Sequence, residues 1–388
     1  MKTFKQFIAL LQLSSSGLRY RLGAVLVTII GTSCVVGVLI SMLSMGTGAR
    51  AMVMQNARAD RALVLSHGAQ GNFDSNLARN VVPIIADMPG IKQDVDGKPL
   101  AYAAVMVIAE GHKRIDDARA NFALLGVGDK FLAVHPEFHL TAGRMFQSGV
   151  RELIAGKSRH ELFKNFEIGD HVRLRGNDWT VVGHFEAGGF LDGSLLADAP
   201  TVMSAFENSS FNTVTVMLES TTAFEKLRAA LKASPSIDVD VRREIDVMRE
   251  LSKQLSGVMD FVGYFVGATM AIGATLGAVN AMYAIVDSRK REIATLRAIG
   301  FGVWPVILAV LTEALVLVLP GAVIGALAAW VLFNGHVVSP GGMSFTLSVT
   351  PGLVALGIGW ALAMGLMGGL LPALRAAGVS VANALRAT

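Results

Sequence analysis

Charged side chains are missing from long stretches of the chain, and these stretches predict its membrane-spanning helices. Residues 22–49 and 261–286 contain no Asp, Glu, Lys or Arg. A third apolar region begins near residue 301; it carries one acid, Glu313, and then no formal charge from 314 to 374. A helix needs about 20 mostly apolar residues to cross a bilayer. We therefore predict four transmembrane helices, at 22–45, 261–286, 303–331 and 352–371.

Turn residues divide the last apolar region into two helices. Asn334-Gly335-His336 is followed by Ser339-Pro340-Gly341-Gly342. Gly and Pro at this density interrupt a helix. Residues 332–351 are therefore expected to form a short loop.

Basic residues on the short flanks predict the orientation. Residues 1–21 carry four Lys or Arg and no acid, and residues 372–388 carry two and no acid. The loop at 287–302 carries four against two acids, whereas 332–351 has only His336. By the positive-inside rule, both termini and the 287–302 loop are cytoplasmic. We therefore expect a multi-pass protein of the inner (cytoplasmic) membrane, with residues 46–260 forming a periplasmic, extracytoplasmic domain.

The pattern of this external domain predicts mixed α/β structure. Strand-like runs at 62–65, 100–109, 122–127, 213–218 and 237–241 are combined with helical patterns at 75–88, where Ser75 is a candidate cap, and 222–233. Two strand-helix-strand units around an insertion predict a ferredoxin-like lobe interrupted by a second lobe at about 128–210. Inside the insertion, runs at 171–175 and 179–185 flank Gly176-Asn177-Asp178, which predicts a hairpin.

The end of the domain, 242–260, returns to helical spacing, with apolar residues on one stripe at Ile245, Met248, Leu251, Leu255 and Val258. No proline separates it from the second transmembrane helix. We predict a continuous helical stalk; the alternative is a surface helix packed against the domain.

Composition supports a membrane protein and places the basic excess on the cytoplasmic side. The 388 residues are 52% hydrophobic and 16% charged, against about 25% charged in soluble domains. Residues 50–260 hold 24 Lys and Arg against 27 Asp and Glu, although the whole chain has a net charge of +4. This distribution favours anionic lipid headgroups and a cytoplasmic partner over nucleic acid. The single cysteine, Cys34, lies in the first helix, so the external domain is expected to fold without disulfides.

Three motifs that could carry chemistry are incomplete. Ala155-Gly156-Lys157-Ser158 resembles the end of a phosphate-binding loop, but Arg151 stands where that loop needs glycine. His160-Glu161 lacks the second histidine of a zinc-protease helix. His135 and His139, around Glu137, could chelate a metal, but a scattered surface pair is the preferred interpretation. We expect no catalytic residues, no metal site and no cofactor bound by this chain.

Small residues and one acid mark the membrane helices. Gly263 and Gly267, Gly273 and Gly277, and Gly321 and Gly325 are pairs one turn apart that allow close helix packing. They could serve contacts within one bundle or, for the second helix, a dimer seam. Glu313 could be an ion ligand, but a structural hydrogen-bonding acid near the cytoplasmic face is favoured.

The 287–302 segment carries the most informative motif. It predicts an amphipathic helix with Ile293, Leu296 and Ile299 on one face and Gly300 as its cap. Arg291-Glu292-Ile293, Leu296-Arg297-Ala298-Ile299-Gly300, Glu313, Gly321 and Gly325 together resemble the permease signature of the MacB/FtsX family. Pro372, Arg375, Leu385 and Arg386 resemble the closing motif of that family. Gly126-Val127, Gly143-Arg144 and Val181-Val182-Gly183 are similar to its periplasmic domain.

The resemblance implies the fold and the partners. It implies four transmembrane helices with a large α/β extracytoplasmic domain of the MacB-like periplasmic type, as in type VII (mechanotransmission) ABC transporter permeases. Members work as dimers on cytoplasmic ABC ATPase subunits, which bind ATP and Mg. No ATPase domain is expected in this chain, so a separate subunit would dock on the coupling helix formed by Ser288, Arg289, Lys290, Arg291, Glu292, Ile293, Leu296, Arg297, Ile299 and Gly300.

The resemblance leaves several roles open. The permease could pair with itself or a related chain, and it could recruit a periplasmic membrane-fusion adaptor and an outer-membrane channel. Efflux of a drug-like compound or peptide and release of a lipid or lipoprotein are all compatible with it. An FtsX-like, non-transporting regulator of a cell-wall hydrolase and a membrane sensor are the alternatives. The alternative to docking for the 288–300 helix is a segment on the lipid surface. Near the C-terminus, Val379-Ser380-Val381-Ala382-Asn383 departs from the family pattern.

Overall fold

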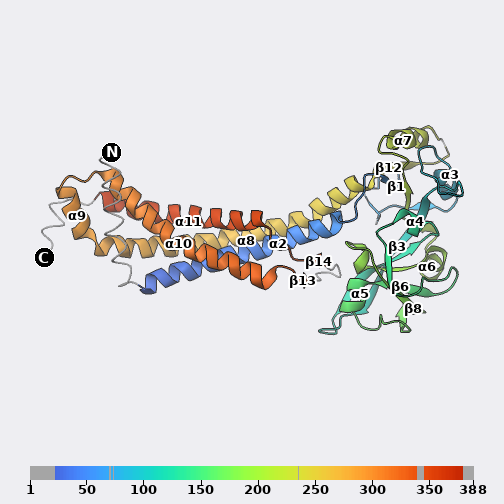
Figure 1. Ribbon diagram of the computed structural model, residues 1–388, viewed down its shortest axis with the longest axis horizontal. Helices are drawn as coiled ribbons and strands as arrows, with labels where there is room; N and C mark the ends of the chain where they lie inside the picture. Colours follow the sequence, from blue (N-terminus) through green and yellow to red (C-terminus); the bar gives the residue numbers. More distant parts are fainter. Residues whose placement is uncertain (1–21, 70, 73, 235, 339–344, 379–388) are drawn as a thin grey trace. The chain divides into compact units, whose positions relative to one another are not determined.

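A computed structural model describes residues 22–69, 71–72, 74–234, 236–338 and 345–378. The chain divides into two compact units (Figure 1). The described part of the membrane unit comprises 22–48, 256–336 and 347–378. The described part of the external unit comprises 49–69, 71–72, 74–234, 236–255, 337–338 and 345–346. Each unit is described separately below.

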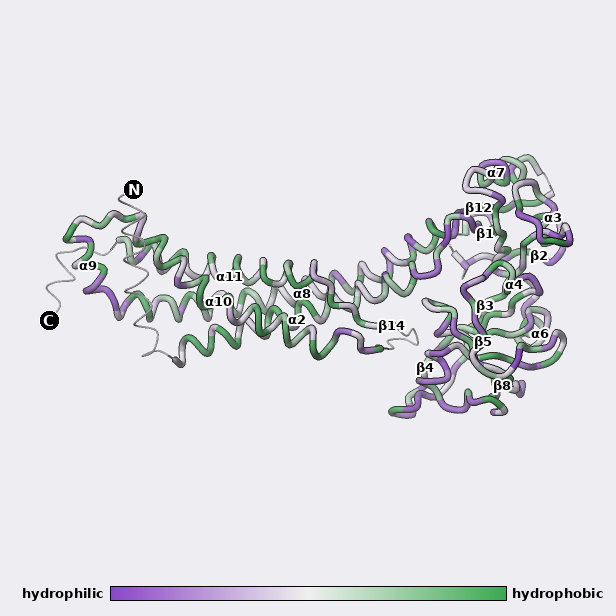
Figure 2. The backbone as a smooth tube through the Cα atoms, in the orientation of Figure 1, coloured by the Kyte–Doolittle hydropathy of each residue, from purple (hydrophilic) through white to green (hydrophobic). Residues whose placement is uncertain are grey.

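Four helices of the described chain are long and apolar enough to cross a membrane: α2 (Leu22–Met54), α8 (Glu244–Ser288), α10 (Val303–Phe333) and α11 (Pro351–Ala377). Hydrophobic residues dominate their membrane-unit portions (Figure 2). The short helix α9 (Lys290–Ala298) lies between α8 and α10 in the chain. The strands β13 (Val337–Val338) and β14 (Phe345–Thr346) pair antiparallel in the loop before α11. The predicted number of spanning helices is confirmed.

The predicted continuous stalk is also present, but it begins at Glu244 rather than at residue 242. Helix α8 runs unbroken for 45 residues, a length of about 68 Å at 1.5 Å per residue. Its first turns belong to the external unit and its remainder, from Ser256, to the membrane unit. The two units are therefore joined by an uninterrupted helical backbone.

The external unit is built on one sheet of ten strands. The main path follows the order β12-β1-β11-β3-β4-β9-β6-β8-β5, and β7 pairs with β8. Their bounds are β1 (Arg61–Ser66), β3 (Ala101–His112), β4 (Arg119–Val127), β5 (His139–Gly143), β6 (Glu152–Gly156), β7 (His171–Leu174), β8 (Asn177–Glu186), β9 (Leu195–Asp198), β11 (Thr213–Met217) and β12 (Val239–Arg243).

The first four strands of that order form the ferredoxin-like lobe. Helix α3 (Val81–Ala86) connects β1 towards β3, and α7 (Ala223–Ala233) connects β11 to β12. Neighbouring strands are antiparallel. The apolar faces of both helices cover a core that includes Val64, Ile85, Val216 and Leu227. Alternating strands and amphipathic helices therefore produce the predicted α/β lobe.

The second lobe continues the same sheet. Strand β3 is long enough to serve both: Ala101–Ala104 pair with β11, and Ala104–His112 pair with β4. Helices α4 (Phe131–Val134), α5 (Lys157–Leu162) and α6 (Ala199–Ala205) and the 3-10 turn η2 (Leu191–Gly193) belong to this half. The sequence indicated two lobes but not that one strand extends through both.

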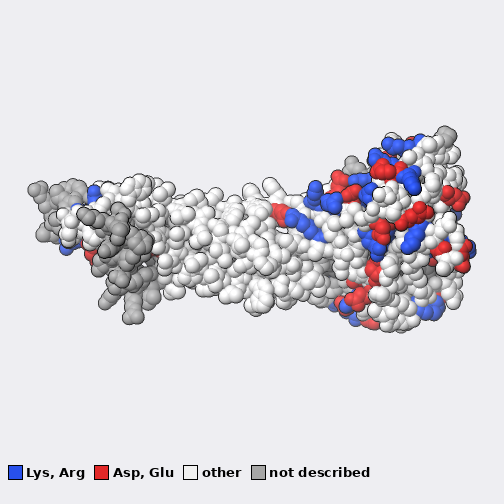
Figure 3. Space-filling model, turned by 45° about the horizontal axis from the view of Figure 1, so that its top comes forward, with Lys and Arg blue, Asp and Glu red and all other residues white. Residues whose placement is uncertain are grey.

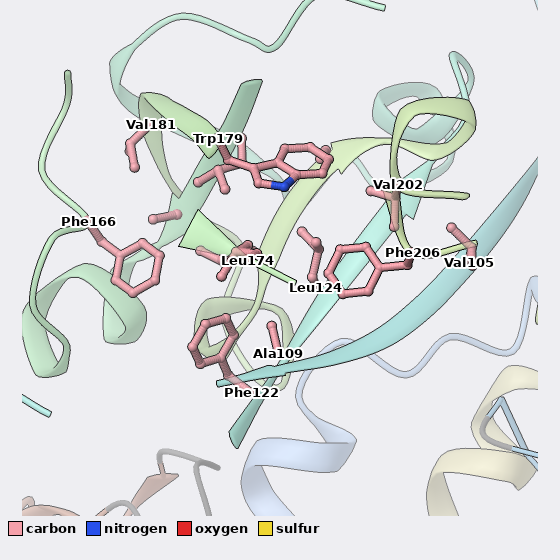
Figure 4. Close-up of a cluster of buried hydrophobic side chains, with 14 of the residues drawn as sticks. Val105, Ala109, Phe122, Leu124, Phe166, Leu174, Trp179, Val181, Val202 and Phe206 are labelled. Carbon is pink, nitrogen blue, oxygen red and sulfur yellow. The ribbon is translucent and has the colours of Figure 1, made fainter. Parts of the chain in front are cut away.

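Aromatic side chains fill the core of the second lobe. Figure 4 shows Trp179, Phe122, Phe166 and Phe206 around the strands that carry Leu124 and Leu174. Trp179 is fully buried. Such packing gives the lobe a rigid interior.

One predicted helix is shorter than expected. Of residues 75–88, Val81–Ala86 form the helix α3, whereas Leu77–Ala78 form the short strand β2, because Leu77 pairs with Phe211 of β10 (Ser210–Phe211). Ser75 does not cap a helix; its Oγ accepts a hydrogen bond of 2.9 Å from the Ser66 backbone N–H. Long-range pairing thus overrides the local helical spacing.

The predicted hairpin is confirmed with a shorter turn. Strands β7 and β8 are antiparallel, and Leu174 pairs with Asn177. Arg175 and Gly176 form the connection with φ values of +46° and +80°. Positive φ at both central residues is typical of a type I′ turn.

Candidate functional site

The candidate site is the junction of α8, α9 and α10 in the membrane unit. Helix α8 ends at Ser288, Arg289 occupies the cap position before α9, and Gly302 precedes α10. Gly300 has φ +102°. Its N–H bonds to Arg297 O at 3.0 Å, and the Phe301 N–H bonds to Leu296 O at 3.1 Å. These bonds make a Schellman motif, so Gly300 caps the helix as its position predicts.

Helix α9 is anchored to α10 through the cap residue that precedes it, Arg289. The Arg289 guanidinium Nη1 lies 3.5 Å from Glu313 Oε2, and its Nε donates to Glu292 Oε2 at 3.0 Å. Glu313 is only 9% exposed. The acid within α10 therefore faces the cap of the short helix, which favours the structural interpretation of Glu313. Sequence alone did not identify Arg289 as its partner.

The far end of α9 is anchored to α11. Arg297 Nη1 donates to the backbone oxygen of Ala377 at 2.6 Å. Ala377 is the last residue of α11, where carbonyl groups lack partners within their own helix. Between the two anchors, Ile293 is buried in a cluster that includes Ile285, Val306 and Ala373, and Ala294 is also buried. Helix α9 is thus fixed to three longer helices.

The remaining surface of α9 faces outward. Arg291, Glu292, Thr295 and Ala298 are exposed, Leu296 is half-buried, and Ile299 is 74% exposed. The predicted single apolar face is therefore wrong: Ile293 packs inside the unit, whereas Ile299 lies after the helix end and points away from it. The helix is also shorter than predicted, because Ser288 continues α8 and its Oγ bonds to Ile285 O at 2.9 Å. Lys290 pairs with Asp287.

The glycine pairs have different surroundings. A side chain at Gly263 or Gly267 would meet Leu43 or Leu39 of α2, and one at Gly321 or Gly325 would meet the α2 backbone near Ile29 or Ser33. At Gly273 and Gly277 nothing lies within 4 Å of an added Cβ. Both line a hollow together with Gly31 and Cys34 of α2. The pair Gly263 and Gly267 and the pair Gly321 and Gly325 thus pack within the bundle. The pair Gly273 and Gly277 leaves an open face.

The closing motif is partly described. Pro372 is buried in α11, and the Arg375 guanidinium lies 5.3 Å from the centre of the Tyr283 ring of α8. Leu385 and Arg386 lie outside the described residues.

On the face shown in Figure 3, charged side chains gather at α9 and on the external unit and are missing between them.

The external unit contains a buried polar cluster centred on Arg61. The Arg61 guanidinium is fully buried; Nε donates to Glu244 Oε2 at 2.6 Å and Nη1 to Glu137 Oε1 at 2.7 Å. His135 Nδ1 lies 2.9 Å from Glu137 Oε1, and its Nε2 lies 2.7 Å from the Tyr102 hydroxyl. The interpretation of His135 as a surface residue is therefore wrong. Its partners are Arg61 of β1, Tyr102 of β3 and Glu137, which follows α4.

Titration of the cluster follows from its geometry. Burial by itself raises the pKa of Glu137, but hydrogen bonds with His135 and Arg61 outweigh it and hold that pKa at about 2. Burial lowers the pKa of His135 more than its bond to Glu137 raises it. Glu137 is therefore a carboxylate and His135 a neutral imidazole near neutral pH. Among the described residues, no group of three or more His, Cys, Asp or Glu could hold a metal ion.

Residues of the other two incomplete motifs make contacts with neighbouring side chains of the external unit. Lys157 begins α5, and its Nζ donates to Glu186 Oε1 at 2.9 Å. The His160 ring stacks on that of His184 with centroids 4.2 Å apart.

Two family models match the chain. The MacB-like periplasmic core domain matches residues 25–234, and the FtsX-like permease C-terminal domain matches residues 264–381. The chain is 23% identical over 402 residues to the uncharacterized ABC transporter permease YknZ of Bacillus subtilis, covering 96% of this chain and 97% of the relative. It is 23% identical over 404 residues to the macrolide export ATP-binding/permease protein MacB of Neisseria gonorrhoeae, covering 98% of this chain but only 61% of that protein.

Two solved structures are similar to the external unit. The periplasmic region of MacB from Actinobacillus actinomycetemcomitans matches with a TM-score of 0.39 and 16% identity, over 51% of this chain and 95% of that one. The extracellular domain of YknZ from Gram-positive bacteria matches with a TM-score of 0.35 and 15% identity, over 47% of this chain and 99% of that one.

Proposed function

Because the chain belongs to the family of ABC transporter permeases that combine a MacB-like periplasmic core domain with an FtsX-like C-terminal domain, we propose that it couples ATP hydrolysis by a separate cytoplasmic ATPase to movement of its external unit. The chain is an inner-membrane transport subunit with an extracytoplasmic domain. ATP and Mg would be bound by the partner, and α9 would be the element on which that partner docks.

The observation that supports this role is the anchoring of α9. Arg289–Glu313 fixes its start to α10, and Arg297 fixes its end to α11. A force applied to the exposed residues of α9 therefore acts on three membrane helices at once. A segment that merely lay on the lipid surface would not need two polar anchors to its own bundle.

Helix α8 supplies a path for that motion. A helix transmits displacement along its axis because each turn is held by backbone hydrogen bonds. Movement at the α8–α9 junction would reach the start of α8 at Glu244, in the external unit. This path requires both termini and α9 to be cytoplasmic, as the flanking positive charges predict.

A second permease would complete the assembly. Gly273 and Gly277 offer an open, small-residue face on α8 that a neighbouring helix could approach closely. The partner could be a second copy or a related chain, and a periplasmic adaptor with an outer-membrane channel would extend the path. The proposed substrates are lipids, lipoproteins, peptides or drug-like compounds, the last because several relatives are named for macrolide export.

Affinity purification of the full chain from detergent-solubilised membranes of its host tests the proposal. The wild type is expected to retain an ABC ATPase identified by mass spectrometry, and Ile299→Asp is expected to lose it. Ile115→Asp is the matched control, because Ile115 is 89% exposed in the external unit. Loss of the ATPase from both variants would contradict docking on α9. So would a wild type that, like the variants, retains no ATPase.

A further inference from the structure

A polar cavity lies beside α9, where α8 and α11 end, and the proposed docking of an ATPase on the outward residues of α9 does not use it. Its volume is about 280 Å³. A water molecule occupies about 30 Å³ in the liquid, so a polar group of several non-hydrogen atoms has room there. The lining includes Asn280, Tyr283 and Asp287 of α8, Lys290 of α9 and Arg375 of α11. All of them belong to the membrane unit.

The cavity carries a net positive charge. Its two cations, Lys290 and Arg375, and its one carboxylate, Asp287, give a formal sum of +1. Lys290 pairs with Asp287, which leaves the charge of Arg375. Within the described residues, the Arg375 guanidinium has no hydrogen bond and no ion pair within 4 Å, although Asp287 attracts it from farther away. An anion that entered the cavity would therefore meet a cation that is still available.

Hydrogen-bond donors surround this charge. The Arg375 guanidinium lies 5.3 Å from the centre of the Tyr283 ring, a cation–π contact that uses none of its five N–H donors. The Tyr283 hydroxyl and the Asn280 side-chain amide likewise have no hydrogen-bond partner in the described part of the chain. Arginine binds phosphate through two parallel hydrogen bonds, and the hydroxyl and the amide add further donors. The lining therefore suits a phosphate group.

Apolar surface continues from the cavity along both long helices. Leu371 lies four residues before Arg375 in α11 and is 56% exposed. Leu276 lies four residues before Asn280 in α8 and is 65% exposed. Side chains four residues apart are neighbours on one helix face, so each leucine lies one turn from the cavity on its membrane side. A phosphate that carries apolar chains would contact both leucines, whereas free phosphate would contact neither.

We propose that this cavity binds the headgroup of an anionic phospholipid from the leaflet that surrounds the ends of α8 and α11. The phosphate oxygens accept hydrogen bonds from Arg375, Tyr283 and Asn280, and the acyl chains lie over Leu371 and Leu276. Basic pockets between transmembrane helices at the membrane surface are typical sites for such headgroups. Binding requires neither ATP nor an ATPase, so this inference does not depend on the coupling proposed above.

Native mass spectrometry of the full chain in detergent micelles, without nucleotide, tests the proposal. The probe is dioleoyl phosphatidylglycerol, which has a net negative charge. Dioleoyl phosphatidylcholine, with the same chains and the same phosphate but no net charge, is the control for charge. Inorganic phosphate, added in large excess, is the control for the chains. We expect a dissociation constant at least about tenfold lower for phosphatidylglycerol than for phosphatidylcholine, and no displacement of phosphatidylglycerol by inorganic phosphate.

Two matched pairs of variants locate the site. Arg375→Gln should weaken phosphatidylglycerol binding about tenfold, whereas Arg291→Gln, at an exposed arginine of α9, should not. Tyr283→Phe should weaken it about threefold, whereas Tyr264→Phe, at an exposed tyrosine of the same helix, should not. Tyr283→Phe removes only the hydroxyl and keeps the ring that Arg375 contacts, so folding does not obscure its result.

Four results would overturn the proposal. Equal affinity for the two lipids would show that the charge of the headgroup does not select the ligand. Complete displacement by inorganic phosphate would assign the cavity to a free anion. Unchanged binding by both Arg375→Gln and Tyr283→Phe would place the lipid elsewhere. Equal losses in Arg375→Gln and Arg291→Gln would reduce the effect to the general positive charge of this surface.

Discussion

In both units, single residues make contacts that their spacing in the sequence does not reveal. Arg61 contacts Glu137 and Glu244, which are 76 and 183 residues away, so no local motif could have marked it. A buried guanidinium with two carboxylates is expensive to disturb, because removal of one partner leaves a charge in a poorly solvated place. Arg61 thereby holds together β1, the segment after α4, and the first turn of α8.

Glu137 makes the stability of the external unit depend on pH. Its pKa is about 2 against a reference of 4.5, so its charged form stabilises the fold above pH 4.5. That contribution is lost as the pH falls from about 4.5 to about 2. We expect Glu137→Gln to lower the thermal midpoint at pH 7 and the difference from wild type to shrink towards pH 3. Intrinsic fluorescence of the detergent-solubilised chain measures it.

The exposed Glu161→Gln serves as the control for that series and should match the wild type at every pH. Suppose that the thermal midpoint of Glu137→Gln stays below that of the wild type by the same amount from pH 7 to pH 3. The charge of Glu137 is then not the source of the stability.

In the membrane unit, Arg289 and Glu313 are expected to act as a pair. Arg289→Ala and Glu313→Gln should each lower the thermal midpoint in nanodiscs. The double variant should lose less stability than the two single variants lose together, with a coupling energy of about 1–2 kcal/mol. Strict additivity would mean that the 3.5 Å approach contributes nothing.

At the scale of elements, helices with a strong period and no competing partner were predictable. The stalk pattern from Ile245 to Val258 is part of α8, and the 222–233 pattern forms α7. The 75–88 pattern formed a helix only at Val81–Ala86, because Leu77 pairs with Phe211, a contact across more than a hundred residues. The α9 surface was only partly predictable: spacing placed Ile293 and Ile299 together, but the end of the helix at Ala298 separates them.

Glycines on different faces of the membrane helices should respond differently to substitution. An added side chain at Gly321 meets Ile29 O at 2.6 Å, whereas Gly273 has open space. Gly321→Val should therefore destabilise the bundle by about 1–3 kcal/mol. Gly273→Val should leave the thermal midpoint unchanged and reduce self-association, measured by mass photometry in detergent. A stable bundle with Gly321→Val would show that α2 and α10 can separate freely.

In the whole molecule, α8 is expected to act as the mechanical link between the α9 junction and the external unit. Lys253→Pro removes a backbone hydrogen bond and kinks the helix, whereas Lys253→Ala keeps it intact. Both variants should still bind the ATPase. Hydrogen exchange of residues 49–255 should differ between ATP-bound and ATP-free complexes for Lys253→Ala, and this difference should vanish for Lys253→Pro. Persistence of the difference in Lys253→Pro would exclude α8 as the link.

An ATPase is expected to dock on the exposed residues of α9, and photo-crosslinking detects that contact. Cys34→Ser removes the only cysteine, and Ile299→Cys or Ile115→Cys then receives a benzophenone label in the purified complex. We expect a crosslink from position 299 to the ATPase subunit and none from position 115. No crosslink from position 299, or an equal yield from both positions, would contradict docking at α9.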